Sequence, residues 1–299
     1  MNGNSSGRNR AQGWKHAKKT GHSNEISFGR SLVASPSEAL RILRLKFGSL
    51  EIDPKLLDVS VDGAKKVASV IQDGQLTTSK VDLVLMHGTQ SVAVSLKKSD
   101  SGQAWLIQVD RFCEVMNRNR RPVPKDALKA LRLFIGGHNL KGLELDFLKA
   151  LASSERLTPE LAAREKKQQR LVAATLSREF NKEWRDLLDY FDKNVSLISD
   201  LMFARGCAKN REDFAEVLVY NKAQPTSRVF LLKELIVFID RRKKLFPVVP
   251  GTKNGGSAIV FPAGNLQMHK PRGNHQMQFR HDLARISSIS NSGKEVGSH

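Results

Sequence analysis

The sequence predicts an α/β (α+β) fold, with a central mixed β-sheet flanked by helices and a mainly helical C-terminal region. Three observations lead to this class: helical spacing of apolar residues over 22–48, three short β-branched runs between 66 and 97, and long helical patterns from 104 to 204. The 299 residues, 40% of them hydrophobic, suffice for one large domain or two ordinary ones.

Two helices are expected first. Residues 22–34 place apolar side chains from Ile26 to Val33 near helical spacing. Residues 35–48 form a stronger pattern, because Ser37 follows Pro36 and can cap a helix. The packing side of this helix is expected to carry Leu40, Leu43 and Leu45.

The next segment changes to strand-like runs. "KVASVI" (66–71), "VDLVLM" (81–86) and "SVAVSLK" (91–97) read as three strands, the last two joined by a turn at "HGTQ". Residues 104–118 then have helical spacing, and Pro124 starts a helix that stops at a Gly pair. Residues 158–204 read as one long helix or two with a break, and strands and turns follow from about 245.

The charge balance is the strongest global signal. Lys and Arg exceed Asp and Glu by 49 to 30, a net charge of +19, which favours a polyanionic partner, nucleic acid first. The alternative is a basic protein whose charge only keeps it soluble. The two cysteines, Cys113 and Cys207, argue against a disulfide framework and a cysteine zinc site. With neither a secretory signal nor an apolar run of membrane length in the sequence, we expect a cytoplasmic protein with no membrane partner.

One constellation suggests chemistry. Side chains alternate along strands, so Ser95 and Lys97 share one face of their strand, and a hairpin through "HGTQ" can turn Asp82 to that same face. A carboxylate and an ammonium group together suit metal-assisted phosphodiester hydrolysis with Mg²⁺. Glu25, on the first expected helix, is the preferred second metal ligand, and Glu38 on the next helix is its rival.

Asp82, followed thirteen positions later by Ser95-Leu96-Lys97, resembles the motif of the PD-(D/E)xK nuclease superfamily, which includes most type II restriction endonucleases. The order of elements is also similar: a helix with an acid, a β-meander with the motif, then a helix. The phrases "GWKHAKKTGHSNE", "SKVDLVL…VAVSLKKSDSGQ" and "FPAGNLQMH…QMQFRH" look similar to restriction-enzyme segments, and the resemblance to the catalytic core covers roughly residues 14–120.

The resemblance implies roles for individual residues. Asp82 would be the metal-binding aspartate and Lys97 the catalytic lysine. Ser95 stands where the family usually has its second acid, so Glu25 would have to supply that charge, while the carbonyl of Leu96 could still ligand the ion. Gln103 resembles a glutamine found just beyond the motif and could contact the water or a phosphate.

A simpler interpretation stays open for each of these residues. Asp82 can be a protective charge beside an apolar strand, and Lys97 and Lys98 can end a strand in solvent. Glu25 can be an ordinary exposed helix acid.

DNA contacts are expected from two segments. The first is the basic stretch after residue 116, and the second is a polar β-ribbon near the C-terminus, where Arg, Asn and Gln suit base edges in the major groove. The ribbon can equally be a polar hairpin that packs on the core. The candidate residues are Lys98, Arg118, Arg120, Arg121, Gln267, His269, Lys270, Arg272, Asn274, Gln276 and Gln278.

These inferences combine into one hypothesis. We expect a disordered basic tail (1–12), a restriction-endonuclease-like core (13–125), a helical region (126–244), a DNA-contacting β/turn segment (245–286) and a disordered tail (287–299). The expected function is Mg²⁺-dependent cleavage of double-stranded DNA at a specific sequence, by a homodimer. The alternatives are a repair or junction nuclease of the same superfamily and a non-catalytic basic DNA-binding protein.

Overall fold

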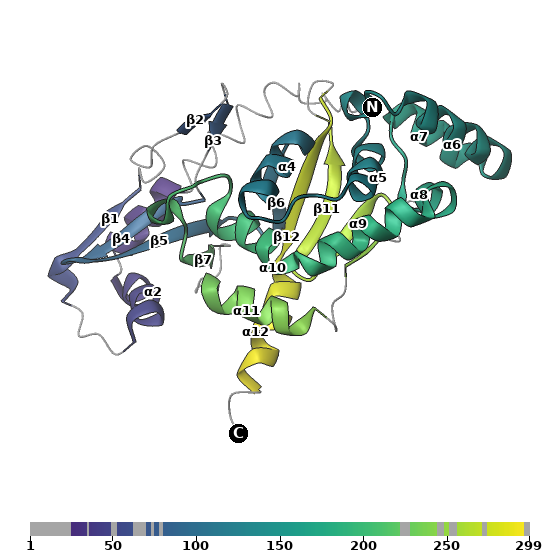
Figure 1. Ribbon diagram of the computed structural model, residues 1–299. Coiled ribbons are helices and arrows are strands. Elements are labelled where there is room, and N and C mark those ends of the chain that lie inside the picture. Colours follow the sequence, from purple (N-terminus) through teal and green to yellow (C-terminus); the bar gives the residue numbers. More distant parts are fainter. Residues whose placement is uncertain are drawn as a thin grey trace, which may run out of the picture. The chain divides into compact units, whose positions relative to one another are not determined.

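The computed structural model is an α+β protein with two five-stranded sheets (Figure 1). It describes residues 25–34, 36–48, 53–61, 70–72, 75–77, 80–221, 228–243, 248–250, 256–270 and 274–295. Contacts divide the chain into two compact units: unit 1 comprises Met1–Ser99 and Ala208–Leu231, and unit 2 comprises Asp100–Cys207 and Leu232–His299. In the described part of the chain, every helix is too short or too polar to cross a membrane.

The sheet of unit 1 is the expected central mixed sheet. Its strand order is β1-β4-β5-β7-β8, and only the β5–β7 pair is parallel. The bounds are β1 Leu57–Ser60, β4 Leu83–His87, β5 Gln90–Lys97, β7 Val217–Tyr220 and β8 Arg228–Leu231. The predicted β4–β5 hairpin is confirmed, and Gly88 at its turn has φ 58°, a conformation that glycine adopts without strain.

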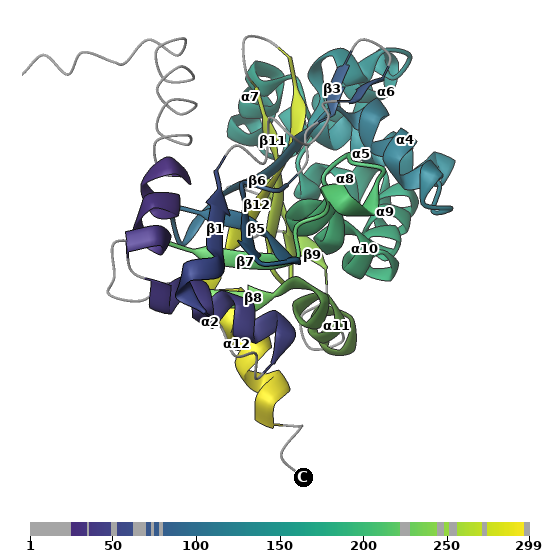
Figure 2. The same ribbon diagram turned by 90° about the vertical axis from the view of Figure 1, so that its left-hand side faces the viewer.

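Two helices cover one face of this sheet (Figure 2). Residues 25–34 are helical, as predicted, and α2 spans Pro36–Phe47. Their apolar side chains share a buried cluster with alternate residues of the sheet: Phe28, Leu32, Ala39, Ile42, Leu43, Leu83, Leu85, Val92, Val94, Leu96, Val217 and Val219. Two details of the prediction are wrong. Ser37 lies inside α2 rather than at its cap, and Leu45 is exposed, because Ala39, Ile42 and Leu43 form the buried side.

The predicted strand at 66–71 does not join the meander. β2 (Val70–Gln72) pairs with β3 (Gln75–Thr77) in a separate two-stranded sheet, and residues 66–69 lie outside the described part. The third strand of the meander is instead β1, which pairs antiparallel with β4 after a short 3₁₀ turn at Pro54–Leu56.

Unit 2 contains the second sheet, which is antiparallel throughout, in the order β6-β12-β11-β10-β9. The bounds are β6 Ser101–Ile107, β9 Val249–Pro250, β10 Ala258–Phe261, β11 Gly264–His269 and β12 Gln276–Asp282. The predicted helix at 104–118 is therefore a strand up to Ile107, and only Val109–Arg118 is helical (α4). Trp105 and Ile107 are buried while Leu106 is half-buried, an alternation that fits a strand better than a helix.

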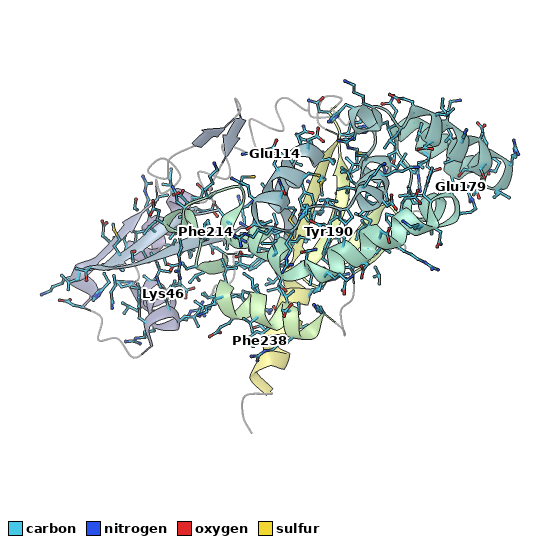
Figure 3. All side chains as sticks on the ribbon, in the orientation of Figure 1. Lys46, Glu114, Glu179, Tyr190, Phe214 and Phe238 are labelled. Atoms are coloured by element: carbon cyan, nitrogen blue, oxygen red, sulfur yellow. The ribbon has the colours of Figure 1, made fainter. Side chains whose placement is uncertain are left out.

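Some helices of unit 2 pack on this sheet, and others pack on neighbouring helices. Their bounds are α4 Val109–Arg118, α5 Lys125–Ile135, α6 Glu144–Leu157, α7 Pro159–Gln168, α8 Ala173–Glu179, α9 Asn181–Lys193, α10 Val195–Asp200, α11 Leu232–Arg242 and α12 Leu283–Glu295. An aromatic cluster joins the two layers. Trp105 stacks on Phe279 at 5.3 Å between centroids, and Phe191 of α9 lies edge-on to Phe261 at 5.4 Å. Tyr190, labelled in Figure 3, donates its hydroxyl hydrogen to the Arg121 carbonyl at 2.6 Å.

The segment 158–204 is broken more often than predicted. Helix α7 begins at the Thr-Pro signal and ends where Gln169 turns left-handed, with φ 52°. The buried carboxylate of Glu165 then accepts the Val172 N–H at 2.8 Å and fixes the start of α8. Further on, β9, β10, β11 and β12 are the strands predicted after residue 245, while α12 extends to Glu295 where the sequence predicts a frayed tail from 287.

Candidate functional site

The polar face of the β4–β5 hairpin in unit 1 brings together three of the predicted residues. Leu83 pairs with Val94, so Asp82 stands opposite Ser95, and Lys97 follows on the same face two residues later. Lys97 Nζ lies 3.8 Å from Asp82 Oδ2. The apolar residues of both strands point to the other face, against the helices of unit 1.

Asp82 completes the strand ladder with its side chain. Its backbone N–H donates to the Val94 carbonyl at 2.8 Å, the last rung before β4 begins. Two residues further along β5, the Leu96 N–H donates to Asp82 Oδ2 at 2.6 Å. Ser95 Oγ donates to the same oxygen at 3.4 Å. A hydrogen bond to an ionised carboxylate is among the stronger ones in proteins, so the carboxylate is held in one orientation.

Lys97 is held by oxygen atoms on this face. Its Nζ donates to Ser95 Oγ at 2.8 Å and to the Leu96 carbonyl at 3.2 Å. Its side chain is 13% exposed and that of Asp82 is 28% exposed, so both can be reached from solvent. Ser95 itself is fully buried, and it acts here as a bridge between the ammonium and the carboxylate.

The groups that could hold Mg²⁺ at this site are few. Asp82 Oδ1 has no hydrogen-bond partner among the described residues, and the Leu96 carbonyl, which accepts from Lys97 Nζ at 3.2 Å, belongs to the same residue whose N–H binds Asp82 Oδ2. Among the residues that the structure describes, no group of three or more His, Cys, Asp or Glu side chains could hold a metal ion. Mg²⁺ can nevertheless bind through one or two carboxylates when water and substrate phosphates complete its shell.

The two candidate second acids lie on helices of the opposite face. Glu25 is half-buried at the first described turn of the helix 25–34, whose Phe28 and Leu32 pack on the apolar face of the sheet. Glu38 lies on α2, where both of its oxygens accept hydrogen bonds from Arg41, at 2.7 and 2.9 Å. Glu38 is thus paired with Arg41, and the sheet separates the packed sides of both helices from Lys97.

Gln103 belongs to a different unit from Asp82 and Lys97. It lies on β6, where its Oε1 accepts a hydrogen bond from Gln278 Nε2 at 3.2 Å, and Gln278 Oε1 accepts one from Gln267 Nε2 at 2.7 Å. Three side-chain amides thus form a row across β6, β12 and β11. Two of them were predicted to contact DNA and one to assist catalysis.

The register extends this row into a polar sheet face. On β11 and β12 the cross-strand pairs are Asn265–Arg280, Gln267–Gln278 and His269–Gln276, and each pair shares one face. None of these six side chains is acidic, and the opposite face carries the aromatic cluster. Asn265 and Arg280 were not among the predicted residues, although the alternation in 264–269 and 276–282 contains them.

The other predicted DNA contacts are scattered over both units. Lys98 follows β5 in unit 1 and is exposed. Arg118, Arg120 and Arg121 are exposed at the end of α4, where Arg118 also donates to the Cys207 carbonyl at 3.3 Å. Lys270 and Asn274 are exposed beside the β11–β12 connection, and Arg272 lies outside the described residues.

No protein-family model matches the chain, and searches of the curated proteins and of the solved structures found no match.

Proposed function

We propose that this protein is a Mg²⁺-dependent endonuclease that cuts double-stranded DNA at a specific sequence, in the manner of a type II restriction enzyme, with a restriction-endonuclease-like core in unit 1. The observation that carries the proposal is the convergence of Asp82 and Lys97 on one sheet face, 3.8 Å apart, in a chain of net charge +19. The buried Ser95 hydroxyl bridges the Asp82 carboxylate and the Lys97 ammonium, an arrangement that a charge protecting a strand edge does not require.

Asp82 Oδ1 and the Leu96 carbonyl would hold the ion, and water and the substrate phosphates would complete its shell. When bound, Mg²⁺ polarises the phosphodiester and makes a water molecule more acidic. Asp82 is prepared for this role because the Leu96 N–H fixes its other oxygen at 2.6 Å.

Lys97 would act on the phosphate. Its ammonium is aimed by Ser95 Oγ and the Leu96 carbonyl, and it retains solvent exposure on the side where substrate can approach. A cation fixed in this position offsets the negative charge that develops on the phosphoryl oxygens, without reorganisation during the reaction.

Duplex binding would depend on the basic surface and on the polar sheet face of unit 2. Lys98, Arg118, Arg120 and Arg121 would neutralise phosphates. The face with Gln267, Gln278 and Arg280 has the side-chain types that read adenine and guanine edges.

A second function is favoured by one specific observation. Ser95 stands in place of an acid, and Lys97 Nζ donates at 3.2 Å to the Leu96 carbonyl, one of the two oxygens that would hold the ion. A DNA-binding protein without catalysis is consistent with such an arrangement. It predicts salt-sensitive DNA binding with no Mg²⁺-triggered cleavage.

The test incubates the purified full chain with unmethylated phage DNA, with Mg²⁺ or with a chelator. Asp82→Asn and Lys97→Met should abolish cleavage. Asp58→Asn, an exposed acid on β1 of the same sheet, and Lys55→Met, an exposed lysine, serve as matched controls and should cut like the parent. Discrete fragments only from the parent and the controls support the nuclease. Retained, salt-sensitive binding with intact DNA in every sample supports the non-catalytic alternative.

A further inference from the structure

The outer face of α6 in unit 2 exposes an apolar stripe. Leu145 is 65% exposed and Leu148 is 57% exposed, and Ala152 one turn further on is also exposed. The spacing of three and then four residues places these side chains in one row along the helix. In Figure 1, α6 and α7 form a helical hairpin at the periphery of unit 2.

The inner face of α6 fixes the position of this stripe. Phe147, Ala150 and Leu151 are buried on that side. Ser154 Oγ lies 3.1 Å from Thr175 Oγ1 of α8, and Ser153 Oγ donates to Glu179 at 2.7 Å. Glu179 is labelled in Figure 3. The stripe is therefore presented by a helix that is already ordered, which lowers the entropic cost of docking.

Charged side chains border the stripe in an ordered way. At 100° per residue, Glu144 and Glu155 lie along one edge, and Lys149 and Arg156 lie along the other. All four are exposed, and their charges cancel. In a chain of net charge +19, this is a surface where a second copy meets little electrostatic repulsion, whereas its acids make it a poor phosphate-binding surface.

We propose that two copies of this chain associate through α6, with the two α6 helices parallel about a two-fold axis. In coiled-coil terms Leu145, Leu148 and Ala152 occupy successive a, d and a positions, so each meets its own counterpart; Glu155 falls at the next d position, and the apolar seam ends before it. Glu144 then holds a g position, and Lys149 holds the e position five residues later. Glu144 of each copy therefore pairs with Lys149 of the other copy, which gives two such pairs. An antiparallel pair would bring acidic edge to acidic edge and is disfavoured.

The size of the contact sets the expected affinity. Two heptads cover less than the roughly 800 Å² per partner of a typical stable interface. We therefore expect a dissociation constant on the order of micromolar, and dimers that form as the concentration rises.

The first experiment is sedimentation of the full chain across the micromolar range, with Leu148→Glu and Leu157→Glu. Leu157 is 64% exposed but lies nine residues, two and a half turns, from Leu148, so it points away from the stripe. Leu148→Glu should weaken association about a hundredfold or more, because two leucines leave the seam and two acids enter it. Leu157→Glu should leave association unchanged. A parent that stays monomeric, or equal effects of the two substitutions, would overturn the proposal.

The second experiment tests the orientation. Glu144→Lys should weaken association about tenfold, and Glu144→Lys with Lys149→Glu should restore it, since the charges are then exchanged rather than lost. Under oxidising conditions Leu145→Cys should form a symmetric disulfide that the parent, with Cys113 and Cys207, does not form. Failure of the charge swap together with failure of the cross-link would refute the parallel pairing. None of these variants alters the site of Asp82, so the outcome does not depend on the nuclease proposal.

Discussion

Removal of the Asp82 carboxylate is the most informative perturbation, because it separates the structural role of this residue from its chemical one. Asp82→Ala leaves the Leu96 N–H without its acceptor at 2.6 Å and Lys97 without its nearest carboxylate. A hydrogen bond to a charged group contributes about 1.5–3 kcal/mol, and water can replace part of it because the side chain is 28% exposed. We expect a loss of about 2 kcal/mol in unit 1. Asp82→Asn keeps an oxygen acceptor and should lose about 1 kcal/mol or less.

The assay for the structural role is amide hydrogen exchange at Leu96. A loss of about 2 kcal/mol corresponds to exchange roughly thirtyfold faster in Asp82→Ala, with a smaller change in Asp82→Asn. Fluorescence is less suitable, because two of the three tryptophans, Trp105 and Trp184, belong to unit 2 and the third, Trp14, lies outside the described residues. Exchange at Leu96 that stays at the parental rate in Asp82→Ala would refute the assigned hydrogen bond.

The chemical role predicts equal effects of the two substitutions on cleavage. Both variants lose the metal-binding charge, so both should cleave DNA about 100- to 1,000-fold more slowly, although Asp82→Asn remains nearly as stable as the parent. Parental cleavage by Asp82→Asn would show that the carboxylate serves only to hold the strand.

Three further predictions concern unit 2 and the turns. Gly264→Ala should destabilise the protein by about 3 kcal/mol or more in a urea titration, since an added Cβ would lie 1.8 Å from the Arg280 carbonyl oxygen. In the same titration Gly88→Ala should cost only about 1 kcal/mol, because the space around Gly88 is open and only its φ of 58° opposes a side chain. Burial, together with the charge of Lys270, lowers the pKa of His275 in the folded state. The unfolded chain therefore takes up the proton first, and stability falls as the pH drops below about 6.5. His275→Gln should lose less stability than the parent between neutral and mildly acidic pH, and an equal loss would contradict this cause. Burial and the charge of Asp110 raise the pKa of the Cys113 thiol to about 11, so Cys113 should react with a thiol reagent at mildly alkaline pH far more slowly in the folded chain than in urea, as mass spectrometry can measure.

Several features of this protein follow from local sequence alone. The β4–β5 hairpin was predictable because two alternating apolar runs flank a Gly-containing turn, and period-two alternation places Ser95 and Lys97 on one face. The starts of α5 and α7 were predictable from Pro124 and Pro159, which suit the first positions of a helix. The candidate site on the hairpin depends on these short-range rules, so it could be found without coordinates.

Other features depend on contacts between residues far apart in the chain. Residues 104–107 have helical spacing, yet they form a strand because β12, some 170 residues later, supplies hydrogen-bond partners. For the same reason β1, rather than residues 66–71, completes the meander, and Gln103 pairs with Gln278 instead of joining Lys97. Local pattern determines which face a side chain occupies within one element. Only the tertiary fold decides which element lies opposite, because that choice is made by burial and strand pairing over the whole chain.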